Sequence, residues 1–119
     1  MAKNKKRNFR PRVYVAGAIS AENHLQFLSN IKKGIEAASK LAAAGYAPYC
    51  SFLDYQYSFF QSLFIEDYQE AAIAFLPVCD AVLVLSGFEK SKGTQAEIKL
   101  AVELGIPIVS KIELLKEVL

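Results

Sequence analysis

The segment from Ser91 to Glu97 carries the residue types whose chemistry is clearest in this sequence. It reads Ser-Lys-Gly-Thr-Gln-Ala-Glu and runs from a polar loop into a stretch with helical periodicity. A glycine at a helix start lets backbone N–H groups and the Ser91 hydroxyl surround an anion such as a phosphate, and the partial positive charge there favours the ionised form. Glu97 comes one turn later, so its carboxylate is expected beside that anion site. The same spacing also fits a surface glutamate that gains only about 0.5 kcal/mol from the helix dipole.

Better-known catalytic and binding motifs do not fit this sequence. The first predicted strand ends in Gly-Ala-Ile-Ser rather than in the dinucleotide fingerprint GxGxxG, and Ser-Lys-Gly-Thr lacks the Gly-Lys-Ser/Thr of a P-loop. His24, the sole histidine, has no second histidine or cysteine with which to share a metal, so we expect it on the surface and outside any Ser-His-Asp triad. Cys50 and Cys79 lie in apolar stretches without CxxC spacing, which predicts buried free thiols rather than a disulfide or a zinc site.

Apolar strand-like runs alternate with helical periodicity along the chain, as expected of a parallel sheet covered on both faces. The predicted strands span residues 12–17, 46–50, 81–85 and 106–109, and the predicted helices span residues 23–44, 63–76, 93–104 and 112–119. Gly45 and Gly105 are expected to cap the first and third helices. Pro48 favours an edge position for the second strand because proline lacks a backbone donor. Since strand–helix–strand crossovers are right-handed, we predict a flavodoxin-like three-layer α/β sandwich with a small parallel sheet of strand order 2-1-3-4.

In such sheets ligands bind outside the carboxyl ends of the strands. The polar segments 17–20, 51–57 and 86–97 follow strand ends and are therefore expected at the binding edge. Asp80 begins a strand, so we expect it at the opposite edge as a structural turn residue.

The segment 51–62 is predicted to be irregular and is unusually rich in aromatic residues. Eight of the 14 aromatic side chains fall between Tyr49 and Tyr68. They can form a second hydrophobic cluster or a subunit interface, or they can stack on a flat heterocycle, and these roles are compatible.

Length and charge indicate one domain preceded by a short basic arm. The 119 residues allow one core, and no apolar run approaches the ~20 residues that span a bilayer. The start Met-Ala-Lys-Asn-Lys-Lys-Arg has no apolar segment directly after it, so we expect a cytoplasmic protein without a secretory signal. Six of the 14 basic residues lie in the first twelve positions, and the other eight face 12 acidic residues. Such an arm can contact nucleic acid or an anionic membrane, but a short arm without interleaved aromatic residues is more often a solvated tail, so we predict a flexible basic tail over 1–11 and a single domain over 12–119, with no membrane partner and nucleic acid disfavoured.

An ordered set of short motifs resembles a known family. It comprises Val-Tyr-Val-Ala-Gly at 13–17, Gly-Tyr at 45–46, Cys-Asp-Ala-Val at 79–82 with Leu85, Gly-Phe-Glu-Lys-Ser-Lys-Gly at 87–93, Glu97, Ala101 and Gly-Ile-Pro at 105–107. Over residues 12–110 the chain resembles the nucleoside 2-deoxyribosyltransferase-like proteins. This family includes the 2′-deoxynucleoside 5′-monophosphate N-glycosidases and short phage and bacterial relatives.

The resemblance implies a retaining reaction at an N-glycosidic bond. It makes Glu97 the nucleophile and Tyr14 the residue that positions it, while Ser91 matches a serine that contacts phosphate in the monophosphate hydrolases. The glycosyl-enzyme would be resolved by water or by a second base, with the two carboxyl groups ~5 Å apart in the usual retaining geometry. The residues expected to bind substrate are Gly17, Ser20, Phe52, Gly87, Ser91, Gly93 and Thr94.

The sequence departs from the family pattern at two positions. Many relatives carry an aspartate where this chain has Ala72, and the hydrolases carry a second phosphate-binding serine where it has Ala18, although Ser20 is near. Candidate acids to replace that aspartate are Asp54, Asp67 and Glu70. We prefer Asp54 because it follows the second strand at the binding edge.

We therefore expect an enzyme that cleaves or transfers the N-glycosidic bond of a nucleoside or its 5′-monophosphate, without a cofactor or metal. An alternative is a phosphoribohydrolase of the lysine decarboxylase-like type, whose signature ends in Gly-Thr-x-x-Glu as do residues 93–97, although Lys90 and Ser91 replace its glycine pair. Another alternative is a non-catalytic nucleotide-binding module that kept the pocket and lost the acid. We also expect a homo-oligomer, a dimer or tetramer, because small relatives of this kind complete their pockets at a subunit interface.

Overall fold

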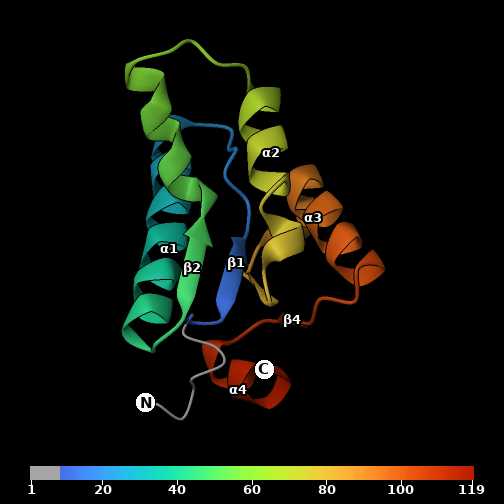
Figure 1. Cartoon of the computed structure of the whole chain (residues 1–119). Coiled ribbons are helices and arrows are strands. Elements are labelled where there is room, and N and C mark those ends of the chain that lie inside the picture. The colour runs from blue at the N-terminus through green and yellow to red at the C-terminus, as the bar shows by residue number, and fades with distance from the viewer. Residues whose placement is uncertain (1–8) are drawn as a thin grey trace.

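The computed structural model describes residues 9–119, and within them four parallel strands form one sheet (Figure 1). The strands are β1 (Arg12–Ala16), β2 (Ala47–Cys50), β3 (Ala81–Val84) and β4 (Ile108–Val109), in the order β2-β1-β3-β4. The longer helices are α1 (His24–Ala43), α2 (Ile65–Ile73) and α3 (Lys92–Glu103), followed by a short α4 (Leu115–Val118). This α/β architecture with order 2-1-3-4 confirms the predicted flavodoxin-like fold.

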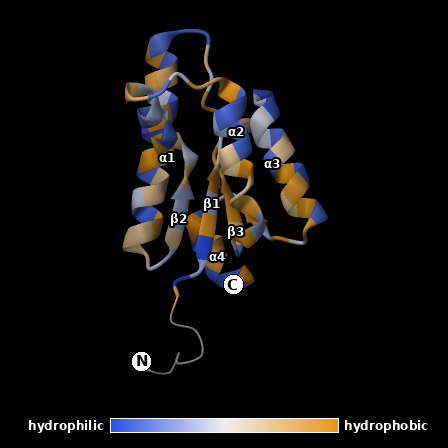
Figure 2. Cartoon of the chain, turned by 45° about the horizontal axis from the view of Figure 1, so that its top comes forward, coloured by the Kyte–Doolittle hydropathy of each residue, from blue (hydrophilic) through white to orange (hydrophobic). Residues whose placement is uncertain are grey.

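Two layers of side chains hold the helices to the sheet. On one face Val13, Val15 and Leu83 pack with α1 residues and with Leu115 of α4. On the other face Tyr14, Val82 and Val84 pack with residues of α2 and α3. Alternate residues of one strand point to opposite faces, so β1 and β3 must be apolar on both sides. Figure 2 accordingly shows β3 as hydrophobic throughout.

Local capping explains where the long helices begin and end. The Asn23 side chain accepts a hydrogen bond from the backbone N–H of Gln26 at 2.8 Å, which satisfies a free donor at the start of α1. Gly45 follows α1 with φ +100° and Gly105 follows α3 with φ +72°, left-handed conformations that glycine adopts without steric cost. Both predicted caps are confirmed. The edge position that Pro48 predicted for β2 is also confirmed.

Three segments differ from the prediction. Residues Ser51–Phe59, predicted irregular, form the 3-10 helix η2. The helix predicted over 63–76 is divided into α2 and the separate turn η3 (Leu76–Val78), because Pro77 has no N–H to continue the α-helical ladder. The terminal helix is likewise divided into η5 (Ile112–Leu114) and α4.

The edge opposite the carboxyl strand ends is structural, as predicted. Asp80 accepts a hydrogen bond from the Arg12 backbone N–H at 2.7 Å, which ties the start of β3 to the start of β1. Most of the predicted basic tail, residues 1–8, lies outside the described residues. Of its remainder, Arg10 donates to the carbonyl oxygens of Ala42 at 3.1 Å and Tyr46 at 3.3 Å, so it is anchored to the domain.

The structure also places the predicted inert residues. Cys50 and Cys79 are buried free thiols, and His24 is exposed at the start of α1, where its ring stacks on Phe27. Among the described helices, none is both long enough and apolar enough to cross a membrane.

Candidate active site

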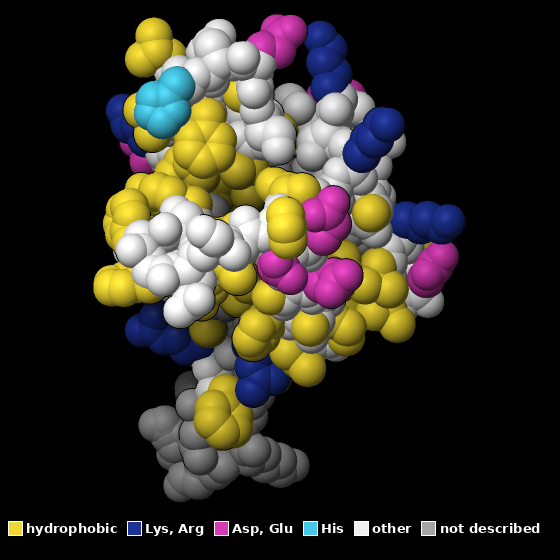
Figure 3. Space-filling view, turned by 90° about the horizontal axis from the view of Figure 1, so that it is seen from above, with side chains coloured by type: hydrophobic (Ala, Val, Ile, Leu, Met, Phe, Trp, Pro, Cys, Tyr) yellow, Lys and Arg dark blue, Asp and Glu magenta, His cyan; other side chains and the backbone are white. Residues whose placement is uncertain are grey.

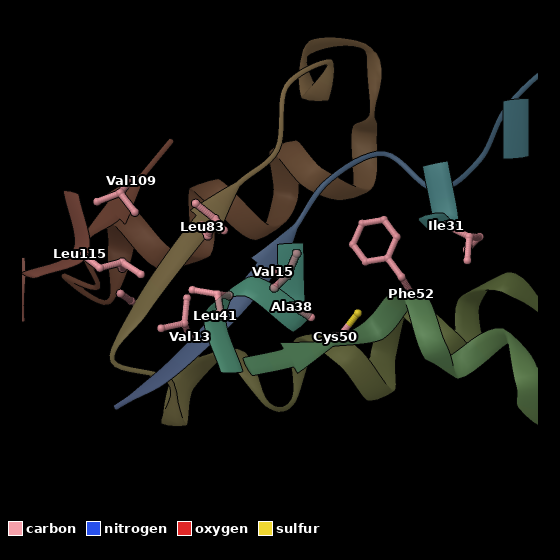
Figure 4. Packing of buried hydrophobic residues seen from close by; sticks show 11 residues of the cluster. Val13, Val15, Ile31, Ala38, Leu41, Cys50, Phe52, Leu83, Val109 and Leu115 are labelled. Atoms are coloured by element: carbon pink, nitrogen blue, oxygen red, sulfur yellow. The ribbon is translucent and has the colours of Figure 1, made fainter. Parts of the chain in front are cut away.

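A cavity of about 540 Å³ lies above the carboxyl ends of the strands. Its walls come from the loop after β1, from α1, from η2, from α2 and from the start of α3. Figure 3 views this end of the molecule from above and shows hydrophobic side chains bordering a hollow. Phe52 and Ile31 line the cavity and also belong to the hydrophobic core cluster between α1 and the sheet (Figure 4).

Most of the predicted site residues meet in this cavity. Its lining includes Gly17, Ser20, Phe52, Ser91, Gly93, Thr94 and Glu97. Tyr14 lies beneath the lining, fully buried on β1. Gly87 lines a second cavity instead, and Asp54 lies outside both linings.

The Glu97 carboxylate contacts the buried hydroxyl of Tyr14, which donates a hydrogen bond to Oε2. The two residues are 83 positions apart in the chain. Burial raises the pKa of Glu97 to about 7, and the Tyr14 hydrogen bond opposes this rise. Burial, reinforced by the negative charge of Glu97, raises the pKa of Tyr14, so its hydroxyl stays protonated and remains a donor. Near neutral pH the carboxyl group can therefore exchange between its ionised and protonated forms.

The sequence predicts an anion cradle at the start of α3. Ser91 is the N-cap, and its Oγ accepts hydrogen bonds from the Thr94 backbone N–H at 3.2 Å and from Thr94 Oγ1 at 2.8 Å. Because the Ser91 hydroxyl accepts in both of these bonds, its own proton is available to donate to a ligand. At Gly93 an added Cβ would meet only Gln69 Nε2, at an ordinary 3.6 Å. Gly93 is therefore not required by packing, and its lack of a side chain instead keeps the helix start open to the cavity.

A second tyrosine–carboxylate pair lies beside the first. The Tyr49 ring stacks on Tyr14 with centroids 5.4 Å apart, and Tyr49 donates a hydrogen bond to Asp54 Oδ2 at 3.1 Å. Burial raises the pKa of Asp54, and the Tyr49 hydrogen bond opposes this rise. The structure thus connects Asp54 to Glu97 through two tyrosines but does not bring its carboxylate to the cavity, so its role as the acid stays a prediction. The other candidates lie elsewhere: Asp67 caps α2 by accepting from the Phe64 N–H at 2.9 Å, and Glu70 is exposed.

Several lining residues were missed by the sequence reasoning. They are Phe27, Ile31, Ile65, Tyr68 and Gln69, whereas Tyr55, Lys90 and Lys92 lie within segments that were expected at the binding edge but were not named as site residues. The aromatic density around residues 49–68 pointed to Tyr55 and Tyr68 only as members of a group. Gln69 could have been found from helical periodicity, because it lies one turn before Ala72 on α2. Ala72 and Ala18 also line the cavity, so the two departures from the family pattern both fall inside it.

A second cavity of about 580 Å³ adjoins the first on the α1 side. It is lined by the loop after β1, by α1 and by the loop after β3. Ala18, Ser20 and Lys90 line both cavities. Glu97 is the one carboxylate in the first lining and Glu22 the one in the second, as far as residues 9–119 are concerned.

Comparison with known proteins identifies the family but no chemistry. Residues 11–110 match a family described as "Domain of unknown function (DUF4406)". The chain belongs to this family. No curated protein matches it. In this DUF4406 chain the matched range runs from β1 to β4 and includes Tyr14, Ser91 and Glu97, so the candidate site lies within the shared domain.

Proposed function

We propose that this protein cleaves or transfers the N-glycosidic bond of a nucleoside or its 5′-monophosphate. The observation that carries the proposal is the Tyr14–Glu97 contact in the wall of a cavity that also contains the open start of α3. A positioned carboxylate beside an anion cradle suits a sugar whose 5′ group is held while its anomeric carbon reacts. The resemblance to nucleoside 2-deoxyribosyltransferase-like proteins assigns the same roles to the same residues.

In the proposed reaction Glu97 is the nucleophile. Its ionised oxygen forms a bond to C1′ while the C1′–N bond breaks, and the bonding electron pair leaves with the base, which takes up a proton. Water then attacks C1′, gives up a proton and releases the Glu97 carboxylate, with net retention. A second base in place of water gives transfer. Tyr14 holds the carboxylate oriented through its hydrogen bond.

The cavity has distinct regions for the parts of such a substrate. At the start of α3 the Ser91 hydroxyl and the Gly93 backbone N–H are assigned to the 5′ group, because the backbone N–H groups of Ser91 and Thr94 already donate to Phe88 O at 2.9 Å and to Ser91 Oγ at 3.2 Å. Tyr55 and Tyr68 supply aromatic surface for the base. The cavity volume of about 540 Å³ falls in the range of ordinary small-molecule sites.

Asp54 is our candidate for the acid that protonates the leaving base. It is half-buried, and its raised pKa favours the protonated form relative to an exposed aspartate. Asp54→Asn should slow release of natural bases but spare a deoxyriboside whose leaving group departs without protonation, such as p-nitrophenolate. Equal loss on both substrates would remove Asp54 from this role.

The main test is release of free base from a panel of ribo- and deoxyribonucleosides and their 5′-monophosphates. We expect release by the wild type, a loss of roughly 10³-fold or more in Glu97→Gln, and no change in Glu103→Gln, which alters an exposed glutamate on the same helix outside the cavity. Undiminished release by Glu97→Gln would refute the mechanism. A preference for ribonucleotides would favour the phosphoribohydrolase alternative.

One observation favours a second candidate, a nucleotide-binding module without activity. Ala72 and Ala18 line the cavity at the two positions where the resemblance leads us to expect an acid and a phosphate-binding serine. Saturable binding of nucleotides by calorimetry, with no base released over long incubation, would support this candidate and exclude the enzyme.

We also propose that a second copy of the chain covers the apolar surface beside the cavity. Phe59, Phe60, Phe64 and Ile65 are between half and nearly fully exposed, and Ile65 also lines the cavity. A partner chain bound to these residues would remove them from water and cover the mouth of the cavity. Light scattering should show a dimer or tetramer that Phe60→Ser weakens, and a monomer at all concentrations would refute the assembly.

A further inference from the structure

We propose that the second cavity binds an additional phosphate, so that the preferred substrate class is nucleotides whose 5′ group is a diphosphate. This deepens the proposed function and rests on it, because it takes the first cavity as the site of the nucleoside and its first phosphate.

The two cavities are adjacent at the point where a 5′ group would leave the first one. Ala18, Ser20 and Lys90 line both, and Lys90 directly precedes the Ser91 N-cap of the anion cradle. A second phosphate attached to one held at Ser91 therefore lies beside Lys90. The second cavity, which α1 residues also line, is the neighbouring space that would receive it.

The second cavity also occupies the crevice where this sheet reverses its strand order. β1 connects through α1 to β2 on one side, while β3 pairs with β1 on the other. The lining comes from the loops that follow β1 and β3, including Ser20 and Ser86, and from α1. Loops diverge at this point of an open parallel sheet, which leaves room for a ligand.

The side chains of the second cavity suit an anion. The Lys33 ammonium donates to the carbonyl oxygen of Ser86 at 3.1 Å and to its Oγ at 3.3 Å. An ammonium has three donors, so one is left for a ligand, and Lys33 is already held in place by the other two. Lys33 and Lys90 together outweigh the single carboxylate of Glu22 in the lining.

A buried amide keeps this wall in shape. The Asn30 side chain donates to the carbonyl oxygens of Ile19 at 3.2 Å and Ser20 at 3.4 Å, and accepts from Gln26 Nε2 at 2.9 Å. These bonds tie the loop after β1 to α1. The loop that separates the two cavities is therefore preorganised before a ligand arrives.

The test measures binding rather than turnover. The full-length Glu97→Ala variant is titrated by calorimetry with deoxynucleoside 5′-mono- and diphosphates, and with inorganic phosphate and pyrophosphate. We expect the diphosphates to bind about tenfold more tightly than the monophosphates, since one charge-assisted hydrogen bond is worth about a factor of ten. Adding Lys33→Met should abolish most of this preference. Adding Lys32→Met, an exposed lysine next in sequence and outside both linings, should preserve it.

A reciprocal variant guards against a merely structural effect of Lys33→Met. Glu22→Gln removes the opposing carboxylate and should tighten diphosphate binding about twofold. Equal affinity for mono- and diphosphates, or equal effects of Lys32→Met and Lys33→Met, would overturn the proposal. The proposal would also be overturned if free pyrophosphate bound in a Lys33-dependent manner while nucleoside diphosphates bound no more tightly than monophosphates. Failure of the wild type to release base would refute the proposed function but leave this affinity comparison intact, so the two failures can be told apart.

Discussion

Replacing Glu97 with glutamine is expected to make the protein more stable, and increasingly so as the pH rises from about 4.5 to 7. Glutamine has nearly the same shape, and its carbonyl oxygen can still accept the hydrogen bond from Tyr14. What the substitution removes is the cost of holding an ionised carboxylate in a largely buried site.

The size of the effect follows from the pKa of Glu97, which burial raises from 4.5 to about 7. Between these values the folded state binds the Glu97 proton more tightly than the unfolded state, so ionisation lowers the free energy of unfolding. The contribution of the protonated carboxyl to the free energy of unfolding is fully present below pH 4.5, decreases as the pH rises, and is gone above about pH 7. At 1.36 kcal/mol per tenfold change in acidity, the whole loss is of the order of 3 kcal/mol.

Urea unfolding of wild type and Glu97→Gln at pH 4.5, 6 and 8 measures this directly. We expect the difference in unfolding free energy between the two proteins to grow across the series in favour of Glu97→Gln. Glu103→Gln, on an exposed part of the same helix, is the matched control and should follow the wild type. A difference that is the same at all three pH values would show that burial does not raise the pKa of Glu97, whatever the protein's activity.

Three further predictions concern Tyr14, Gly93 and Gly34. Tyr14→Phe removes the hydrogen bond that opposes the rise in the Glu97 pKa. The rising limb of a kcat/KM–pH profile should therefore shift from about pH 7 to higher pH, with about tenfold less activity at neutral pH. A limb at an unchanged pH would exclude the contact. Gly93→Ala should leave the unfolding free energy unchanged or raise it by up to about 1 kcal/mol, while weakening monophosphate binding in calorimetry, because its methyl group enters the cradle without clashing elsewhere. Gly34→Ala should lower the unfolding free energy by about 1–3 kcal/mol in urea titrations, because its methyl group would overlap the Phe52 ring; a stability equal to wild type would show that the ring can move aside.

Much of the fold could be predicted from local sequence signals. Asn23 and Gly45 mark the ends of α1 through side-chain capping and left-handed backbone geometry, and both signals act within a few residues. The strand order followed from chain connectivity and the handedness of crossovers, with Pro48 assigning β2 to an edge. The 3-10 helix η2 was missed, although Phe52, Tyr55 and Phe59 recur at the three- and four-residue steps of a helix.

The sequence predicted most residues of the candidate site, but not how their side chains are arranged. The helix start at Ser91 is a local motif, and its capping bond to Thr94 forms as expected. Gly87 and Asp54 were expected in the same place because both follow a strand end. Instead, Gly87 lines the second cavity and Asp54 turns toward Tyr49.

By itself the sequence determined the strands, the long helices, the strand order and the helix start that faces the binding edge, since periodicity, caps and crossover handedness are properties of neighbouring residues. Tertiary structure alone decided that Tyr14 meets Glu97, that burial brings the pKa of that carboxyl close to neutrality, and that a second cavity containing Lys33 adjoins the first. Such contacts and burial depend on how segments distant in the chain pack against one another, and no local pattern encodes the distance between them.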